Sequence, residues 1–363
     1  MIIDLLSIIL WSYIVLVGMV VVGWNKKTKK SVNSYVGLVS VVVPFRNEES
    51  NLETTIESIL KNGNAQFELI LVDDHSEDNS LSICESYEAK FKNVTVLRLN
   101  TGTGKKAAIQ LAIEHASSEI ILQTDADCTV KKTWITSMKE QFHNQKILLI
   151  GPVKVIATNE KWNWFNQLEF GYLQTFTGAF ANFDNPIMAN GANMMYTKTI
   201  YWEYKQSKLG ADYASGDDQF LLSHVKTHHS NAIQYVKNQD AIVSTIFPSK
   251  WEAMITQRVR WAKKNNNSTG IDIIIGFLLL SAQFLLPVCL ILSMFNFKFI
   301  ETFWTVFILK TGIELVLAFT FMKFFRINRL RYVPLFTIMY PYFLVKIMVQ
   351  AKRDSNKWKG RKL

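Results

Sequence analysis

Charged residues are scarce in this chain. Asp, Glu, Lys and Arg make up 19% of its 363 residues, whereas 49% are hydrophobic. Ordinary soluble domains carry about 25% charged residues, so the composition argues against a purely soluble protein. The chain also has only three cysteines, Cys84, Cys128 and Cys289, and they lack the spacing of a metal site. We therefore expect reduced, structural thiols in a cytoplasmic domain.

Several recurrent sequence patterns are also missing. The chain contains no internal repeat, no low-complexity linker and no basic run interleaved with aromatic residues, which nucleic-acid-binding segments would show. The net charge is nevertheless +10. Because the basic clusters stand beside long apolar segments, anionic lipid headgroups explain them better than nucleic acid does. We expect a membrane as partner and no nucleic acid.

Residues 1–25 are expected to form an N-terminal transmembrane anchor. The run from Ile2 to Trp24 has Asp4 as its only charge and is long enough to cross a bilayer as a helix. It lacks a basic start and a small-x-small cleavage site, which favours a retained anchor over a cleaved signal. Four lysines follow directly: Lys26, Lys27, Lys29 and Lys30. By the positive-inside rule they place the next domain in the cytoplasm.

Residues 265–350 are expected to form a C-terminal membrane region, followed by a basic tail at 351–363. The apolar segments are Ile271–Phe295, Phe299–Met322 and Val333–Val349. The second segment carries Lys310 and Glu314, which can pair on one helix face. The third is short, is broken by two prolines and lies between two basic clusters. Because a single crossing would leave one cluster outside, we predict two spans plus a re-entrant or interfacial segment.

Residues 36–264 alternate short apolar runs with amphipathic stretches. Strands are predicted at 38–43, 67–72, 94–97 and 120–123, and helices ending at 60 and spanning 78–89 and 105–115. Such alternation predicts an α/β domain with a parallel sheet and right-handed crossovers. The aromatic-rich stretch Trp162–Phe183 fits an interfacial helix or an acceptor-groove wall as well as it fits plain core packing.

Carboxylates follow two of the predicted strands. Asp125 and Asp127 are separated by one residue, so alternation along an extended chain points both to one side. Asp73 and Asp74 follow another strand, and parallel strands present their carboxyl ends to ligands. Paired carboxylates suit Mg²⁺ or Mn²⁺ held jointly with a diphosphate, and a carboxylate can also accept hydrogen bonds from a base or a ribose. For each motif alone, a turn or a helix cap is the ordinary interpretation.

Three further motifs bear on chemistry. Lys105 opens a helix after a glycine-rich turn and offers a cation to a nucleotide, although the spacing is not that of a P-loop. Asp217 and Asp218 stand at another helix start, where a carboxylate serves as a cap or as a catalytic base. Arg260 and Trp261 lie on an amphipathic segment just before the membrane, which also suits an interfacial anchor.

In this order and at this spacing the motifs resemble those of the family-2 glycosyltransferases. The resemblance is to the membrane-bound branch with cellulose and hyaluronan synthases, ceramide glucosyltransferase and bacterial lipid or carotenoid glycosyltransferases, and it runs from about Val39 to Trp261. It implies a GT-A fold, which is Rossmann-like with a mostly parallel sheet, and a bacterial-type inner (plasma) membrane location. The donor-binding residues it implies are Pro44, Asn47, Glu48, Asp73, Asp74, Lys105, Asp125, Gln257, Arg260 and Trp261. The metal ligands it implies are Asp125 and Asp127, the catalytic residues are Asp218, Asp217 and Arg260, and the acceptor residues are Asn193 and Trp261.

The reaction implied is an inverting, metal-dependent transfer from a nucleotide-sugar to a hydroxyl of a membrane-associated lipid acceptor. Uridine is the common base in the family, and Asp218 would be the catalytic base. Asp217, where the family has Glu, is a modest departure. A processive polysaccharide synthase is the alternative, disfavoured because such relatives carry more spanning helices. A catalytically silent membrane scaffold that binds a nucleotide is disfavoured because it would not need the full set of acids.

Overall fold

The computed structural model describes residues 1–26, 34–143, 146–211, 213, 215–248, 250–262 and 270–353, and the backbone at 357–358 and 361–362. Lys27, Lys29, Lys30 and most of the predicted basic tail lie outside the described residues. The chain divides into two compact units. One comprises Met1–Lys26, Ala157–Phe180 and Phe247–Asn356, and the other comprises Lys27–Ile156, Ala181–Ile246 and Lys357–Leu363. We call them the apolar-helix unit and the sheet unit.

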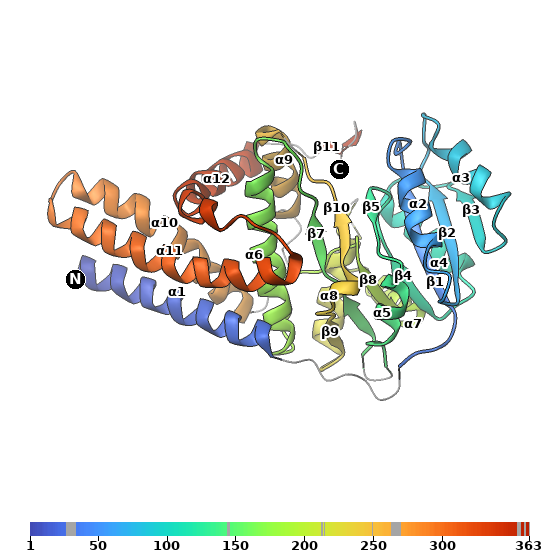
Figure 1. Ribbon diagram of the computed structural model, residues 1–363, viewed down its shortest axis with the longest axis horizontal. Helices are drawn as coiled ribbons and strands as arrows, with labels where there is room; N and C mark the ends of the chain where they lie inside the picture. Colours follow the sequence, from blue (N-terminus) through green and yellow to red (C-terminus); the bar gives the residue numbers. More distant parts are fainter. Residues whose placement is uncertain are drawn as a thin grey trace. The chain divides into compact units, whose positions relative to one another are not determined.

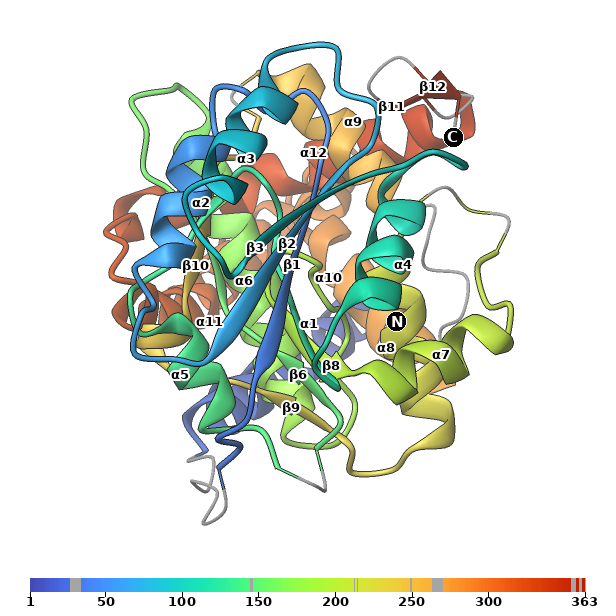
Figure 2. The same ribbon diagram turned by 90° about the vertical axis from the view of Figure 1, so that its right-hand side faces the viewer.

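A seven-stranded sheet forms the centre of the sheet unit (Figures 1 and 2). Its strands are β1 (Val39–Phe45), β2 (Phe67–Asp73), β3 (Val94–Arg98), β4 (Ile120–Gln123), β6 (Leu148–Ile150), β8 (Met194–Thr197) and β9 (Ile233–Tyr235). Their order is β3-β2-β1-β4-β8-β6-β9. Strands β1 to β4 run parallel, whereas β8 is antiparallel to both of its neighbours. The predicted mostly parallel sheet is confirmed.

Helices and a smaller sheet surround these strands. The helices are α2 (Leu52–Leu60), α3 (Ser80–Glu88), α4 (Lys105–His115), α5 (Trp134–Lys139), α7 (Lys198–Gln206), α8 (Asp217–His228) and the 3-10 helix η1 (Gln239–Ala241). The smaller sheet has the order β5 (Cys128–Thr129), β10 (Val243–Thr245), β7 (Val153–Val155). Helix α4 packs on β1 and β2, whose register sets Phe45 opposite Asp73. Both strands therefore end at the same edge of the sheet.

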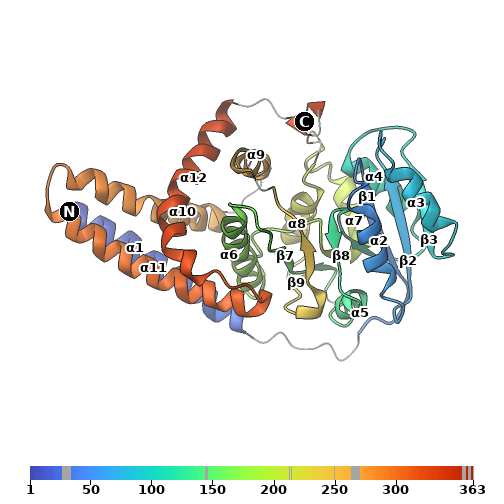
Figure 3. The ribbon, with the colours of Figure 1, turned by 45° about the horizontal axis from the view of Figure 1, so that its top comes forward.

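The apolar-helix unit is built from α1 (Ile2–Asn25), α6 (Asn163–Ala181), α9 (Trp251–Ala262), α10 (Gly270–Ser293), α11 (Lys298–Phe325), the 3-10 helix η2 (Leu330–Tyr332) and α12 (Val333–Arg353). Helices α1, α10 and α11 lie side by side (Figures 1 and 3). Among the described residues, four helical segments are long and apolar enough to cross a membrane. They are α1, α10, α11 and Leu330–Arg353. Lys310 and Glu314 form the predicted ion pair inside this unit.

The structure bears on two predictions for this unit. Helix α12 continues through Pro341, so the predicted break at the prolines is wrong, although its re-entrant or interfacial placement stays a prediction. An interior proline removes one backbone hydrogen bond but need not end a helix that its neighbours hold in place. Helix α6 is mostly buried, and the Phe165 ring contacts Phe336 and Phe343 at centroid distances of 4.8 Å and 4.9 Å. Of the interpretations of the aromatic-rich stretch, these contacts favour core packing.

Candidate functional site

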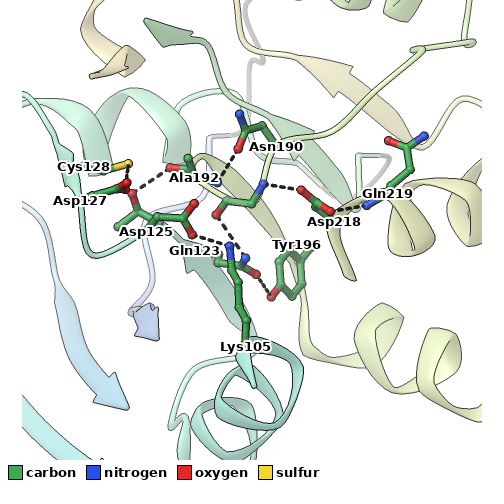
Figure 4. A network of polar contacts seen from close by, with 12 residues as sticks. Lys105, Gln123, Asp125, Asp127, Cys128, Asn190, Ala192, Tyr196, Asp218 and Gln219 are labelled. Atoms are coloured by element: carbon green, nitrogen blue, oxygen red, sulfur yellow. Dashed lines mark hydrogen bonds and ion pairs between the residues drawn. The ribbon is translucent and has the colours of Figure 1, made fainter. Parts of the chain in front are cut away.

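The sheet unit places a lysine against the predicted metal-binding carboxylates. Asp125 and Asp127 follow β4, and Lys105 is the first residue of α4. The Lys105 ammonium donates a hydrogen bond to Asp125 Oδ1 and forms an ion pair with it (Figure 4). The two motifs lie 20 residues apart in the sequence and meet because β1 and β4 are neighbouring parallel strands with α4 packed on β1.

Negative charge is concentrated around Asp127. Burial, followed by the nearby carboxylates of Asp125 and Glu48, raises the pKa of Asp127 to about 6. Cys128 Sγ donates to Asp127 Oδ1 at 3.6 Å. Carboxylates that raise one another's pKa are relieved by a bound cation, and oxygen ligands suit hard divalent ions. The side chains of Asp125 and Asp127 therefore fit Mg²⁺ or Mn²⁺.

Gly191 lies between Lys105 and Asp218, the predicted catalytic base. Its backbone N–H donates to Asp218 Oδ2 at 3.1 Å, and its carbonyl oxygen accepts from Gln123 Nε2 at 3.2 Å (Figure 4). A Cβ atom at this position would lie 2.9 Å from Lys105 Nζ and 2.8 Å from Gln123 Nε2. Gln123 is in turn fixed by Tyr196, whose hydroxyl donates to Gln123 Oε1 at 2.8 Å. A Cβ atom at position 191 would therefore push the Lys105 or Gln123 side chain away from this point of convergence.

The carboxylates of Asp217 and Asp218 stand in the first turn of α8. Gly216 precedes them with φ 98°, a conformation that L side chains rarely adopt. Asp218 Oδ1 accepts from the backbone N–H of Gln219 at 2.9 Å. Burial opposes the charged form of Lys105, but the carboxylates of Asp125, Asp217 and Asp218 raise its pKa above the ordinary value. Residues from β4, α4 and α8 thus share one electrostatic environment.

The predicted nucleotide-binding pair ends β2. Asp73 Oδ1 accepts from the backbone N–H of Ser76 at 3.0 Å, and Asp74 Oδ1 lies 3.2 Å from His75 Nδ1. The Asp74 N–H donates to the Phe45 carbonyl at 2.9 Å. His75 has a positive φ of 59°, in the left-handed region that such residues seldom occupy. Backbone strain of this kind often accompanies functional sites.

The loop after β1 is tied to the loop after β2. Asn47 Oδ1 accepts from the Glu77 N–H at 2.8 Å, and the Glu48 N–H donates to Ser80 Oγ at 2.8 Å. Asn47 also has a positive φ, of 51°. Pro44 lies within β1, one residue before its end. These contacts hold the two predicted donor-binding loops side by side, while the residues' binding roles stay predictions.

Asn193 makes only structural contacts among the described residues. Its side chain is fully buried, and its Oδ1 accepts from Trp134 Nε1 at 3.0 Å. Its Nδ2 donates to the carbonyls of Pro152 at 2.9 Å and Ala241 at 2.8 Å. Its acceptor-binding role stays a prediction, and the contacts favour a part in holding the loop around Gly191.

Gln257, Arg260 and Trp261 lie on α9 in the apolar-helix unit, and their predicted roles at the donor and acceptor stay predictions. Sequence reasoning missed the residue between them. Arg258 is buried and donates through Nε to both carboxylate oxygens of Glu169, each at 2.9 Å. The Arg258 guanidinium also lies over the Trp261 ring, 4.4 Å from its centroid. Arg258 thus anchors α9 to α6.

Gly191, Gln123 and Tyr196 were not expected to be site residues. Gly191 stands two residues before Asn193 in the sequence Gly191-Ala192-Asn193, of which only Asn193 was predicted to be a site residue. Gln123 is the last residue of the apolar strand β4, and Tyr196 lies within the apolar strand β8. A polar side chain inside a buried strand needs a hydrogen-bond partner, and this signal could have identified both as site residues.

Comparisons with known proteins point to the glycosyltransferases. The model of the family "Glycosyl transferase family 2" matches residues 40–205. Glycosyltransferase GlyG of Streptococcus pneumoniae is 38% identical over 104 residues, which are 29% of this chain and 35% of that protein. The undecaprenyl-phosphate 4-deoxy-4-formamido-L-arabinose transferase of Shewanella sediminis is 34% identical over 99 residues, which are 26% of this chain and 30% of that protein. The chain thus matches about a third of the length of these curated relatives.

One solved structure matches nearly the whole chain. It is mannosyltransferase PcManGT from Pyrobaculum calidifontis in complex with GDP-Man and Mn2+, with a TM-score of 0.60. The match covers 98% of this chain and 99% of that one, at 16% sequence identity. At this identity the likeness establishes a shared fold.

Proposed function

Because residues 40–205 of the chain match the model of glycosyl transferase family 2, we propose that the protein is a glycosyltransferase that moves a sugar from a nucleotide-sugar to a hydroxyl of a membrane-associated acceptor. The observation that carries the proposal is the convergence of Lys105, Asp125 and Asp218 around Gly191, with Asp217 next to Asp218 in the first turn of α8. Such a set can bind a diphosphate together with a cation and, beside it, deprotonate an attacking hydroxyl.

On the donor side, Asp125 and Asp127 would hold a divalent cation, Mg²⁺ or Mn²⁺. When bound, such an ion supplies positive charge beside the departing diphosphate. Lys105 would add a second positive charge to the same phosphates, and Asp73 and Asp74 would accept hydrogen bonds from the base or the ribose. PcManGT, of like fold, is in complex with GDP-Man and Mn2+, which supports a nucleotide-sugar and a divalent ion here.

On the acceptor side, Asp218 would act as the base. Its carboxylate is oriented by the backbone N–H groups of Gly191 and Gln219, so one face is fixed before the acceptor arrives. As the acceptor oxygen forms its bond to the anomeric carbon, its proton passes to Asp218. The bond from that carbon to the diphosphate oxygen breaks on the opposite face, and the nucleoside diphosphate leaves with the electron pair. The configuration inverts through an oxocarbenium-like transition state.

A lipid is the acceptor that the apolar-helix unit suits best. Four described helical segments are long and apolar enough to cross a membrane, and one relative is named for an undecaprenyl-phosphate substrate. The unit also has a hollow of about 500 Å³ lined by Trp162, Lys250, Trp251, Glu252, Met339 and Tyr342. Aromatic rings beside one lysine and one glutamate suit an acceptor that is part lipid and part polar headgroup. We place the sheet unit on the cytoplasmic side of the inner membrane, with Gln257, Arg260 and Trp261 assisting at the donor.

The test starts from the purified chain in detergent, supplied with Mg²⁺ or Mn²⁺, a panel of nucleotide-sugars and a membrane lipid extract. We expect one sugar to be transferred to a lipid, with a product of defined mass. A ladder of masses would instead favour a processive polysaccharide synthase. Donor binding without transfer or hydrolysis of any donor would favour a silent scaffold and refute the proposal.

Asp218→Asn separates catalysis from binding. Loss of a general base lowers turnover by about 10²–10⁴-fold. We expect a fall in that range with donor affinity, measured by calorimetry, within about twofold of the wild type. Glu53→Gln, an exposed carboxylate on α2, is the matched control and should keep full activity. Equal losses of turnover and donor affinity would assign Asp218 to donor binding instead.

A further inference from the structure

A second cluster of ligand-type side chains lies where α8 ends. Glu203 on α7, His224 on α8 and His229 directly after α8 present ligand atoms that all lie within 4.8 Å of one another. His224 follows Asp218 by six residues, which is about 9 Å along a helix axis. We propose that Glu203, His224 and His229 form a second metal site, which takes Zn²⁺ or a chemically similar transition-metal ion and goes beyond the sugar-transfer function.

The buried ring nitrogens of His224 lack hydrogen-bond partners among the described residues. Its side chain is 6% exposed, and neither ring nitrogen has a hydrogen-bond partner within the described part of the chain. Buried polar groups are nearly always bonded, so an imidazole with two unbonded nitrogens calls for an explanation. A metal ion on one of its nitrogens supplies it.

The other two ligands are already assembled and reachable from solvent. His229 Nε2 lies 2.9 Å from Glu203 Oε2, and their side chains are 32% and 44% exposed. His228 contacts His224, the buried ligand of the three. Its ring stacks on His224 with centroids 4.4 Å apart, and its Nδ1 lies 2.9 Å from the His224 carbonyl oxygen. The buried ring is held in place while the exposed pair can adjust.

The ligand set selects the class of ion. Two imidazole nitrogens and one carboxylate oxygen are typical of Zn²⁺ sites that keep a fourth position for water, whereas Mg²⁺ and Ca²⁺ take oxygen ligands. Ligand atoms around tetrahedral Zn²⁺, with bonds of about 2.0–2.1 Å, lie about 3.3 Å apart. Rotations of the Glu203 and His229 side chains that move their ligand atoms by about 1 Å therefore bring all three ligand atoms to the spacing that Zn²⁺ requires.

The position of the site indicates what the ion does. It would tie α7 to the end of α8, and α8 begins with the carboxylates of Asp217 and Asp218. A cross-link at one end of a short helix limits the movement of the other end. We infer that the ion stabilises the sheet unit and positions α8, and that it takes no part in proton transfer.

The test is a Zn²⁺ titration of the full chain, freed of any histidine tag, in a competition assay with a chromophoric chelator. Millimolar Mg²⁺ is present throughout to occupy the site at Asp125 and Asp127. We expect one Zn²⁺ per chain, and binding at least tenfold weaker in Glu203→Gln and in His229→Asn. Both substitutions lie on exposed or half-exposed side chains, so the fold should survive. His115→Asn, at an exposed position on α4, is the matched control and should bind as the wild type does.

Two further readouts use the same proteins. Zn²⁺ should raise the Tm of the wild type and of His115→Asn, and raise it less in the two ligand variants. Co²⁺ in place of Zn²⁺ should give visible absorption typical of a tetrahedral site, and the ligand variants should lose it. Equal Zn²⁺ affinity in all four proteins would overturn the proposal. Loss of Zn²⁺ binding in Asp127→Asn would overturn it as well, because the ion would then belong to the donor site.

Discussion

Replacing Gly191 with alanine tests the convergence of side chains at the sheet edge. The φ of Gly191 lies outside the left-handed region, so alanine adds a Cβ atom without backbone strain. That atom would lie 2.8 Å from Gln123 Nε2 and 2.9 Å from Lys105 Nζ, whereas ordinary contacts begin at 3.4 Å. Either each nitrogen therefore moves away by about 0.5 Å, or the loop that carries residue 191 moves by a similar distance.

The lysine is the group that gives way. Gln123 is 2% exposed and is held by the Tyr196 hydroxyl and the Gly191 carbonyl, whereas the Lys105 side chain is 25% exposed. Displacing Lys105 weakens a charge-assisted hydrogen bond, worth about 1.5–3 kcal/mol. We expect donor affinity to fall by about 10–100-fold, since each 1.4 kcal/mol is a factor of ten. The free energy of unfolding should change by less than about 1 kcal/mol, because a half-exposed side chain can rearrange.

Donor affinity is measured by calorimetry and stability by thermal unfolding in detergent. Gly63→Ala is the control, because a Cβ atom there meets nothing within 4 Å. If alanine at position 191 acts through Lys105, adding Lys105→Met should cost little more. Wild-type donor affinity in Gly191→Ala would refute the reasoning. Additive losses of donor binding energy in the double variant Gly191→Ala with Lys105→Met would refute it as well.

Three further predictions rest on contacts within single units. Arg258→Met leaves the buried Glu169 carboxylate without its partner, so thermal unfolding should show a loss of about 3–5 kcal/mol that Glu169→Gln partly restores; no loss, or no restoration, would contradict the pairing. Asp127→Asn should weaken Mn²⁺ binding more than tenfold in calorimetry while the protein stays folded, and unchanged Mn²⁺ affinity would place the ion elsewhere. Burial raises the pKa of the Cys84 and Cys128 thiols, so neither should react with a disulfide reagent at pH 8 until the protein is denatured, and prompt reaction would show that they are accessible.

Much of the sheet unit could be predicted because its signals are local. Strands such as 120–123 and helices such as 105–115 agree with the structure to the residue, since short apolar runs and amphipathic periods report directly on secondary structure. Parallel strands present their carboxyl ends at one edge of a sheet, so the placement of Asp73 and Asp125 at that edge could be predicted once each was assigned to the end of a strand. The GT-A fold predicted from the motifs is confirmed.

Other features depend on contacts that no local pattern records. The continuity of α12 through Pro341 depends on neighbouring helices, because packing can outweigh one lost backbone hydrogen bond. The pairing of Arg258 with Glu169 joins residues 89 positions apart, and either charge alone would have been assigned to the surface.

By itself, the sequence determined the α/β alternation, the apolar helices and the acidic motifs, because each depends on the chemistry of neighbouring residues. The tertiary structure decided how far those motifs share a site. It brought Lys105 onto Asp125, set Gly191 against Asp218 and gathered Glu203, His224 and His229 at the end of one helix. Distances between side chains from different elements follow from packing, and packing is a property of the whole folded unit.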